Sequence, residues 1–454
     1  MNDLTRGPIA GHLIRFASFI ALTTVFQTLY FLIDLYFVGR LGRDAIAGVG
    51  LAGNLAMLVL ALTQSLGVGA TALVAQAMGA KDRPRAETVF NQAFVLSSIA
   101  GAVFFLIGFS LKGVYTRALA ADPATAEYGS QYLAWFVPAM MLQFCMVALG
   151  AALRGVGDMK MPTLMQVGTV GINIVLAPVL IAGWGTGHPL GTAGAGLATF
   201  IAVVAGSAAF AFYFQRPSSP LRLRPRLWRP DLKIWRQILG IGLPSGGEFA
   251  LIAVYMTMVY DIIQGFGPAA QAGFGIGVRL MQSLFLPAVA IGFATSPVVG
   301  QNYGARHPER VRQAFFTAAA LSGGVMIVIT LLCHIAPDAL VGVFSSDPAV
   351  IAFGSEYLRI VSWNFVASGV IFAGSSTLQG IGNTRPALMA SALRLVLFAI
   401  PAYLLARQPS FEMRHVWYLA TASVWIHVVV LLLMVRWQFR ERLRGMTPAP
   451  VSVT

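Results

Sequence analysis

Charged side chains are scarce in this 454-residue chain. Asp, Glu, Lys and Arg together make up 11% of the residues, whereas apolar residues make up 57%. A typical soluble domain carries about 25% charged residues, so the composition excludes most water-soluble folds and leaves little sequence for a soluble catalytic domain. Because a membrane-spanning helix needs roughly 20 mainly apolar residues, the apolar content is enough for about a dozen spans.

Acidic residues and cysteines are also few. The chain has 17 Asp and Glu against 31 Lys and Arg, which gives a net charge of +14. In a membrane protein this excess indicates contact with anionic lipid headgroups, and we expect no nucleic-acid partner. Cys145 and Cys333 both lie in apolar stretches, so neither a disulfide framework nor a thiolate metal site is expected. The first ten residues lack the pattern of a removable signal peptide, so the first hydrophobic segment is expected to be a retained span.

Hydropathy predicts twelve membrane spans. The ranges 93–111, 161–215 and 415–435 contain no Asp, Glu, Lys or Arg, and the second holds two spans separated by a Gly, Pro and His cluster at 183–191. The spans are expected near residues 10–38, 45–78, 88–111, 127–151, 162–182, 191–214, 239–264, 270–303, 313–335, 350–378, 386–406 and 415–436.

Most Lys and Arg residues fall on every second connection between these spans and at the two ends of the chain. This alternation predicts that both termini are cytoplasmic. The densest basic stretch lies at the middle of the chain and contains Arg222, Arg224, Arg226, Arg229, Lys233 and Arg236. We interpret it as a linker held against the anionic cytoplasmic leaflet, and a regulatory lipid site or a nucleic-acid site is the alternative.

The chain repeats itself at an offset of 225 residues. The matched pairs include Gly42 with Gly267, Ala45 with Ala270, Gly48 with Gly273, Gln76 with Gln301, Gly79 with Gly304 and Gly155 with Gly380. Six spans, an even number, separate the equivalent positions, so the two halves enter the membrane in the same direction. Several secondary transporters have this plan, with a substrate route between the halves, and duplication for folding alone is the alternative.

The predicted fold is therefore an all-α membrane protein with twelve transmembrane helices in two six-helix lobes. Its expected parts are an N-terminal lobe (1–215), a basic cytoplasmic linker (216–238), a C-terminal lobe (239–436) and a cytoplasmic tail (437–454).

Several ordered motifs resemble the multidrug and toxic compound extrusion (MATE) family. They are the segment from Ile33 to Gly42 with Ala45 to Gly50, the two Gln-x-x-Gly-Ala segments 76–80 and 301–305, and the glycine turns 154–158 and 379–383. The resemblance covers essentially the whole chain. It implies a bacterial inner-membrane antiporter that exports amphipathic organic cations in exchange for protons or sodium ions. It implies no enzyme activity, no cofactor and no resident metal.

We expect a monomer whose partners are membrane lipids and small cationic or amphipathic substrates.

Two acidic residues are predicted to lie inside the membrane, where ionisable groups are costly and usually face a cavity or a partner. Asp34 lies late in the first span and shares a helical face with Gln27 and Tyr30. Burial away from water favours the protonated form of a carboxyl group, so such a residue can bind and release a proton near neutral pH. In the resembling family the matching first-span aspartate couples transport to the cation. Glu248 follows Pro244 in the seventh span and matches a family glutamate approximately, so we expect it to bind cation or cationic substrate. A structural role is the alternative for each acid.

The sequence departs from the family pattern at a second acidic position. Many members carry an aspartate four residues after a fifth-span asparagine, whereas here Asn173 is followed by Ala177. Asp34, Asn173 and Thr199 are still expected to form a cation-coupling site, with one carboxylate fewer. Because hard cations prefer charged oxygen ligands, this favours a proton, and Na⁺ at Asp34 is the alternative.

Two further expectations concern side chains inside the spans. Gln27, Tyr30 and Met256 are candidates for a substrate cavity, since methionine and aromatic side chains suit adaptable binding. Arg279 and Arg394 either neutralise a carboxylate of the C-terminal lobe or extend toward an interface.

Two other functions remain as alternatives. A lipid-linked oligosaccharide flippase of the same superfamily would need basic residues lining its cavity to hold pyrophosphate, whereas the central acids here outnumber the secure central bases. A membrane-embedded enzyme is the remote alternative, since the sequence contains no HExxH motif, nucleophile elbow or paired catalytic carboxylates on one helix.

Overall fold

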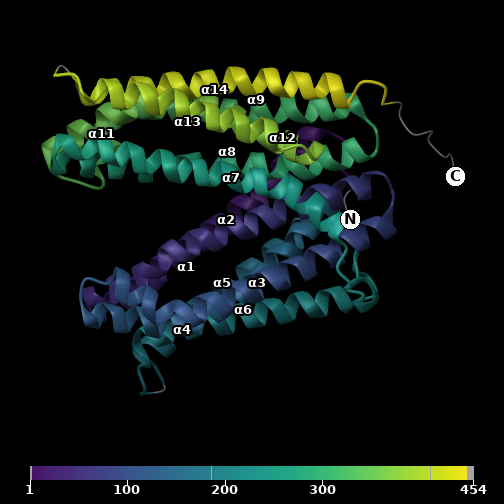
Figure 1. Cartoon of the computed structure of the whole chain (residues 1–454), viewed down its shortest axis with the longest axis horizontal. Coiled ribbons are helices and arrows are strands. Elements are labelled where there is room, and N and C mark those ends of the chain that lie inside the picture. The colour runs from purple at the N-terminus through teal and green to yellow at the C-terminus, as the bar shows by residue number, and fades with distance from the viewer. Residues whose placement is uncertain (1–2, 186, 410, 447–454) are drawn as a thin grey trace. The chain divides into compact units, whose positions relative to one another are not determined.

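The computed structural model describes residues 3–185, 187–409 and 411–446, and within these ranges it contains helices and no strands. Eleven helices are long and apolar enough to cross a bilayer, and the bent pair α11 and α12 makes a twelfth span (Figure 1). The all-α membrane fold predicted from the sequence is confirmed. The helices are α1 (Ile9–Gly39), α2 (Arg43–Gly79), α3 (Arg83–Leu119), α4 (Pro123–Val156), α5 (Lys160–Ala182), α6 (Gly191–Gln215), α7 (Leu232–Ile263), α8 (Pro268–Gly304), α9 (Pro308–Ile335), α10 (Pro337–Gly342), α11 (Pro348–Val361), α12 (Asn364–Ile381), α13 (Arg385–Leu405) and α14 (Met413–Arg442), with short 3₁₀ turns η1 (Pro225–Leu227) and η2 (Gln264–Phe266).

The helices form two compact units. Unit 1 comprises Asp3 and Phe19–Gly242, and unit 2 comprises Leu4–Ser18 and the described chain from Leu243 onward. In unit 1, α4 packs against α2, α3 and α6, while in unit 2 α12 packs against α8, α9 and α14. Two helices are divided between the units, because the first turns of α1 belong to unit 2 and the first turns of α7 belong to unit 1.

The 225-residue repeat extends to the backbone dihedral angles. Lys81 and Arg306, which follow α2 and α8, both have φ of 58°, a left-handed conformation that is uncommon for residues with a side chain. The glycines that end α4 and α12, Gly157 and Gly382, have φ of 90° and 86° and cap their helices in the left-handed region. The two halves therefore repeat their turns as well as their spans.

Glycines allow the helices of each unit to approach closely at equivalent positions. A Cβ atom added at Gly48 of α2 would lie 2.8 Å from the backbone nitrogen of Gly129 and 2.8 Å from the carbonyl oxygen of Thr125 in α4. At the equivalent Gly273 of α8, an added Cβ would lie 3.0 Å from the backbone nitrogen of Gly354 in α11. Lipid gives little hydrophobic drive for helix association, so such close backbone packing supplies much of the attraction.

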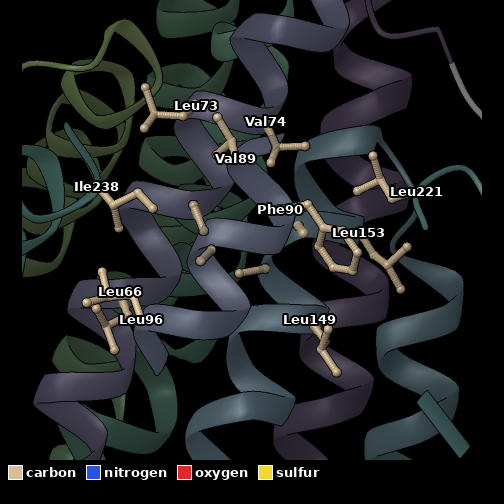
Figure 2. Close-up of a cluster of buried hydrophobic side chains, with 14 of the residues drawn as sticks. Leu66, Leu73, Val74, Val89, Phe90, Leu96, Leu149, Leu153, Leu221 and Ile238 are labelled. Atoms are coloured by element: carbon tan, nitrogen blue, oxygen red, sulfur yellow. The ribbon is translucent and has the colours of Figure 1, made fainter. Parts of the chain in front are cut away.

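The hydrophobic core of unit 1 extends beyond the spans to the segment that follows α6. Figure 2 shows Leu221 and Ile238 packed with Leu153, Phe90 and Leu66 of the neighbouring helices. Both Leu221 and Ile238 are fully buried. The segment between α6 and α7, through Leu221, and the first turns of α7, through Ile238, are therefore part of the packed structure of unit 1.

Helix α7 begins at Leu232, seven residues before the predicted start of the seventh span. The Asp231 carboxylate accepts a hydrogen bond of 2.9 Å from the backbone nitrogen of Lys233, and the Asp231 carbonyl accepts one from the backbone nitrogen of Trp235. These bonds satisfy donors at the helix start. Hydropathy alone does not detect such a polar, capped first turn.

The tenth predicted span is bent rather than continuous. Helices α11 and α12 meet at an angle of 52° across Ser362 and Trp363. The carbonyl oxygen of Ser362 accepts hydrogen bonds from the backbone nitrogen of Phe365 at 2.9 Å and from the hydroxyl of Thr330 in α9 at 3.0 Å, so it remains bonded at the bend. The sequence also gave no indication of α10, a six-residue helix in the preceding connection.

Several acids outside the spans have a structural role at helix starts. Asp122 and Asp347, which are equivalent in the repeat, each precede a proline at the start of α4 and α11 and accept hydrogen bonds from Thr125 and Ala349. The hydrogen bonds from the backbone and side chain of Thr125 lower the pKa of the exposed Asp122 carboxyl. These acids are accounted for by capping, which separates them from the acids within the spans.

The close contact at Gly48 can be tested with two substitutions on the same helix. We expect Gly48→Ala to destabilise the protein by roughly 1–3 kcal/mol, because the added methyl group meets the backbone of α4. Gly53→Ala is the matched control, since an added Cβ at Gly53 meets nothing within 4 Å. Thermal unfolding in detergent measures both, and equal stability of the two variants would contradict the close packing.

Candidate functional site

Asp34 lies within α1 in unit 1 and is 9% exposed. Its Oδ1 atom is buried and has no hydrogen-bond partner among the described residues. Tyr30 precedes it by one helical turn, so the two side chains lie on the same face of α1. A buried carboxylate without a full set of partners is costly, so this position favours binding of a proton or another cation.

Thr199 of α6 is the centre of a hydrogen-bond network beside this face. Its hydroxyl donates to the carbonyl oxygen of Ala195 at 3.2 Å and accepts from Asn173 Nδ2 of α5 at 3.2 Å. The Tyr30 hydroxyl lies 3.1 Å from the same oxygen. Because the one Thr199 proton is already donated to Ala195, Tyr30 is the donor in this contact. Three helices of unit 1, α1, α5 and α6, thus meet at one hydroxyl group.

This network leaves acceptors without donors. Thr199 Oγ1 makes one donated and two accepted hydrogen bonds, the full capacity of a hydroxyl group. Asn173 Oδ1, like Asp34 Oδ1, is buried and has no partner among the described residues. A proton on the carboxylate or a cation near these oxygens would supply the missing positive charge.

Ala177, four residues after Asn173, occupies the position at which the resembling family often carries a second aspartate, and its surroundings are apolar. Ala177 is fully buried and packs in a hydrophobic cluster with Phe37, Ile181 and Ala195. The site in unit 1 therefore contains a single carboxylate.

Glu248 of α7 lies in unit 2 and has a different environment. Its Oε2 atom accepts a hydrogen bond of 2.9 Å from the hydroxyl of Ser375 in α12, whereas its buried Oε1 atom has no partner among the described residues. One turn away on each helix, Gln379 Nε2 donates to Ser245 Oγ at 3.1 Å. The two polar pairs join α7 to α12.

The two arginines within predicted spans have different surroundings. The Arg394 guanidinium of α13 lies over the ring of Tyr255, 4.8 Å from its centroid. Within the described ranges, neither Arg394 nor Arg279 forms an ion pair. Arg279 of α8 is exposed. A cation over an aromatic ring is stabilised by the ring's negative face.

Some of the predicted site residues lie together in the structure, and others do not. Tyr30, Asn173 and Thr199 are joined by hydrogen bonds, with Asp34 one turn from Tyr30. Gln27 is exposed on α1, and Met256 of α7 packs at the edge of a hydrophobic cluster in unit 2. The predicted substrate cavity of Gln27, Tyr30 and Met256 stays a prediction.

Sequence reasoning missed Ser375, the partner of Glu248. Its signal was a polar run, Ser375 to Thr377, within an otherwise apolar span. At the repeat offset Ser375 matches Gly150, so the partner, like Glu248 itself, is specific to one half of the chain.

Comparison with protein families gives two matches to one family model, MatE. The model matches residues 20–179 and again residues 244–404. The two matched ranges reproduce the internal repeat seen in the sequence and in the helices.

Proteins of similar sequence match along most of the chain. A probable multidrug resistance protein, YoeA of Bacillus subtilis, is 26% identical over 404 residues, covering 87% of each chain. The multidrug export protein MepA of Staphylococcus aureus is 22% identical and covers 86% of each chain. A probable multidrug resistance protein, NorM of Thermotoga maritima, is 24% identical and covers 89% of this chain and 86% of its own.

Solved structures share the fold. A transporter of the MOP superfamily from Pyrococcus furiosus superposes with a TM-score of 0.89 at 24% identity, covering 98% of both chains. A MATE structure in the bent conformation superposes with a TM-score of 0.90 at 24% identity, covering 97% of both chains. With the family model matching both halves, the chain belongs to the MatE family, the multidrug and toxic compound extrusion transporters.

Proposed function

We propose that this transporter is a secondary antiporter that exports amphipathic organic cations in exchange for protons by alternating access. The observation that carries the proposal is the pair of buried acceptors, Asp34 Oδ1 and Asn173 Oδ1, around the saturated Thr199 hydroxyl. An unmet buried acceptor costs about 1–3 kcal/mol, and more when it is charged. A cation that binds here removes this cost, so its binding and release can be linked to a change between states of the protein.

A proton is the favoured coupling ion, and Na⁺ is the alternative. A hard metal cation is best held by several oxygen ligands with negative charge among them. The site offers one carboxylate, and Ala177 supplies no ligand atom. A proton needs only the Asp34 carboxylate itself.

Glu248 is proposed to bind the cation or the cationic substrate in unit 2. Its Oε1 atom lacks a donor, while Ser375 holds its other oxygen and fixes the carboxylate in place. The names of the bacterial relatives, which include multidrug resistance and multidrug export proteins, support organic drugs as the substrate class. The buried acids Asp34 and Glu248 favour cationic substrates over the pyrophosphate of a lipid-linked oligosaccharide, which is the alternative.

The transporter is proposed to act as a monomer in the bacterial inner membrane, with both termini in the cytoplasm. The alternation of basic residues between loops supports this orientation. It requires no cofactor other than the ion gradient, and lipids and small molecules are its proposed partners.

Asp34→Asn tests the coupling site. We expect this variant to lose gradient-driven uptake of a cationic dye into liposomes, because an amide cannot bind and release a proton. Imposed pH and sodium gradients applied separately to the wild type identify the coupling ion. Asp261→Asn is the control, since Asp261 is exposed and its carboxylate bonds, among the described residues, only to Gln264 and Tyr403. Normal uptake by Asp34→Asn would overturn the assignment.

Thr199→Val tests the network beside Asp34. The valine keeps the shape of the side chain but leaves Asn173 Nδ2 and the Tyr30 hydroxyl without their acceptor. We expect the cation concentration for half-maximal transport to change by about tenfold, which corresponds to roughly 1.4 kcal/mol, within the range for the loss of these two hydrogen bonds. The control is Thr28→Val, because the hydroxyl of the exposed Thr28 donates to the carbonyl oxygen of Thr24 within α1. An unchanged cation dependence would remove Thr199 from the site.

Glu248→Gln tests the site in unit 2. The amide oxygen can still accept from Ser375, so the fold should be retained while the charge is lost. We expect KM for a cationic dye to rise about tenfold or more, because one tenfold step corresponds to roughly 1.4 kcal/mol of lost charge interaction. Glu309→Gln, an exposed acid of the same unit, is the control. If both variants transport the dye like the wild type, Glu248 has a structural role only.

A further inference from the structure

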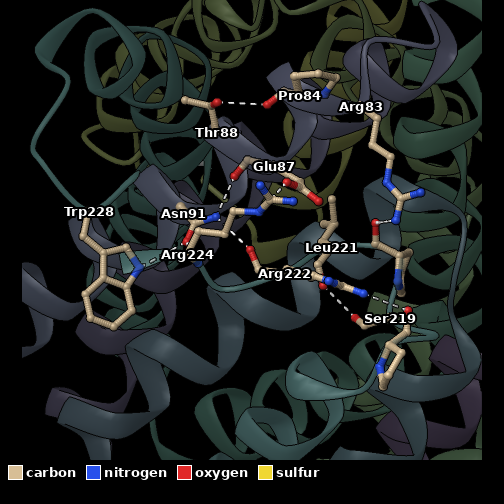
Figure 3. Close-up of polar contacts among 12 residues, drawn as sticks. Arg83, Pro84, Glu87, Thr88, Asn91, Ser219, Leu221, Arg222, Arg224 and Trp228 are labelled. Carbon is tan, nitrogen blue, oxygen red and sulfur yellow. Dashed lines mark hydrogen bonds and ion pairs between the residues drawn. The ribbon is translucent and has the colours of Figure 1, made fainter. Parts of the chain in front are cut away.

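Two adjacent amide side chains of α3 hold the segment between α6 and α7. Asn91 is fully buried, and its Nδ2 atom donates to the carbonyl oxygens of Glu87 and Arg222 at 2.8 and 2.9 Å. Its Oδ1 atom accepts from the backbone nitrogen of Arg224 at 2.8 Å and from Trp228 Nε1 at 3.1 Å (Figure 3). All four hydrogen-bonding positions of this amide are therefore used.

Gln92 is 2% exposed and repeats the arrangement further along the segment. Its Nε2 atom donates to two carbonyl oxygens and its Oε1 atom accepts from two nitrogen donors. These partners are Leu227 O at 2.7 Å, Arg229 O at 2.7 Å, Asp231 N at 2.9 Å and Trp235 Nε1 at 2.8 Å. The backbone of the segment is thus fixed to α3 at both ends of η1.

The basic side chains of the same segment are exposed and give its surface a strong positive charge. Between Arg216 and Arg236 the chain has seven basic residues and one acid, Asp231, which caps α7. All seven basic residues are exposed. One of them, Arg224, forms an ion pair of 3.0 Å with Glu87, and the others have no acidic partner in the described ranges. We call residues 216–236 the linker platform.

Apolar side chains are exposed among these charges. Trp228 is 40% exposed although its indole nitrogen is held by Asn91, and Leu232 is 72% exposed. Exposed tryptophan and leucine beside Lys and Arg are typical of segments that lie at the surface of a bilayer. The chain also leaves one membrane span at Gln215 and enters the next through α7, which keeps the platform near the membrane surface.

We propose that the linker platform is a pre-ordered binding surface for the phosphate headgroups of anionic phospholipids in the bilayer. The exposed arginines and lysine supply the charge that phosphate recognises, and Trp228 and Leu232 supply apolar contact with the lipid. Because Asn91 and Gln92 already fix the backbone, headgroup binding does not have to order the segment first. The bound lipid stabilises unit 1, since Leu221 within the platform and Ile238 just after it are part of the core of unit 1.

The test uses the full chain in nanodiscs of phosphatidylcholine with or without phosphatidylglycerol. We expect phosphatidylglycerol to raise the unfolding temperature of the wild type by several degrees, and 0.5 M NaCl to reduce this rise, since salt screens exposed charges. A variant with Arg222, Arg226, Arg229 and Lys233 replaced by Gln should lose more than half of the rise. If salt does not change the rise in the unfolding temperature of the wild type, the proposal is overturned, whatever the variants show.

The matched control replaces four exposed basic residues of unit 2 instead, namely Arg436, Arg440, Arg442 and Arg444. It changes the net charge equally and should keep the full effect of phosphatidylglycerol. Equal losses in the two variants would mean that net charge, and not the platform, is responsible.

Three further measurements separate the bilayer from other phosphate-bearing ligands. Leu232→Gln should reduce the effect of phosphatidylglycerol, and glycerol phosphate in solution should not reproduce it, because both lack the apolar contact. Binding of a fluorescent oligonucleotide to the wild type, together with no response to phosphatidylglycerol, would overturn the lipid assignment in favour of nucleic acid.

Discussion

Inside a bilayer no water replaces a missing hydrogen-bond partner, so each buried polar group must be satisfied by the protein or remain at a cost. Most polar groups in this transporter meet that condition. Asn91 and Gln92 use every hydrogen-bonding position, and so does the hydroxyl of Thr199. The buried oxygens Asp34 Oδ1, Asn173 Oδ1 and Glu248 Oε1 are among the exceptions within the described residues, and two of the three belong to carboxyl groups.

The internal repeat is shared by the structural features of the two halves but not by their buried acidic residues. Turns, caps and close glycine contacts recur at an offset of 225 residues, down to the same φ at Lys81 and Arg306. The buried acids do not recur, since Asp34 matches Val259 and Glu248 matches Thr23. A duplicated scaffold thus carries two different polar sites, one in each unit.

The fold was largely predictable from the sequence, because the length of an apolar stretch indicates a membrane span. The 225-residue repeat supports this prediction, since equivalent spans occur in both halves of the chain. The start of α7 and the bend at Ser362 were not predictable, since they involve local hydrogen bonds, accepted by Asp231 and donated by Thr330, that leave hydropathy unchanged. In the site, Tyr30, Asn173 and Thr199 were expected together and are bonded together. Ser375 was missed because a serine in an apolar helix has no periodic pattern that names its partner.

The division of α1 and α7 between the two units has a consequence for biosynthesis. Leu4, in the part of the N-terminus that belongs to unit 2, bonds through its backbone nitrogen to Gln301, 297 residues further along the chain. At a synthesis rate of about 5–20 residues per second, the ribosome needs roughly 15–60 s to make that partner. The hydrogen bond between Leu4 and Gln301 therefore cannot form until about two thirds of this chain has been synthesised.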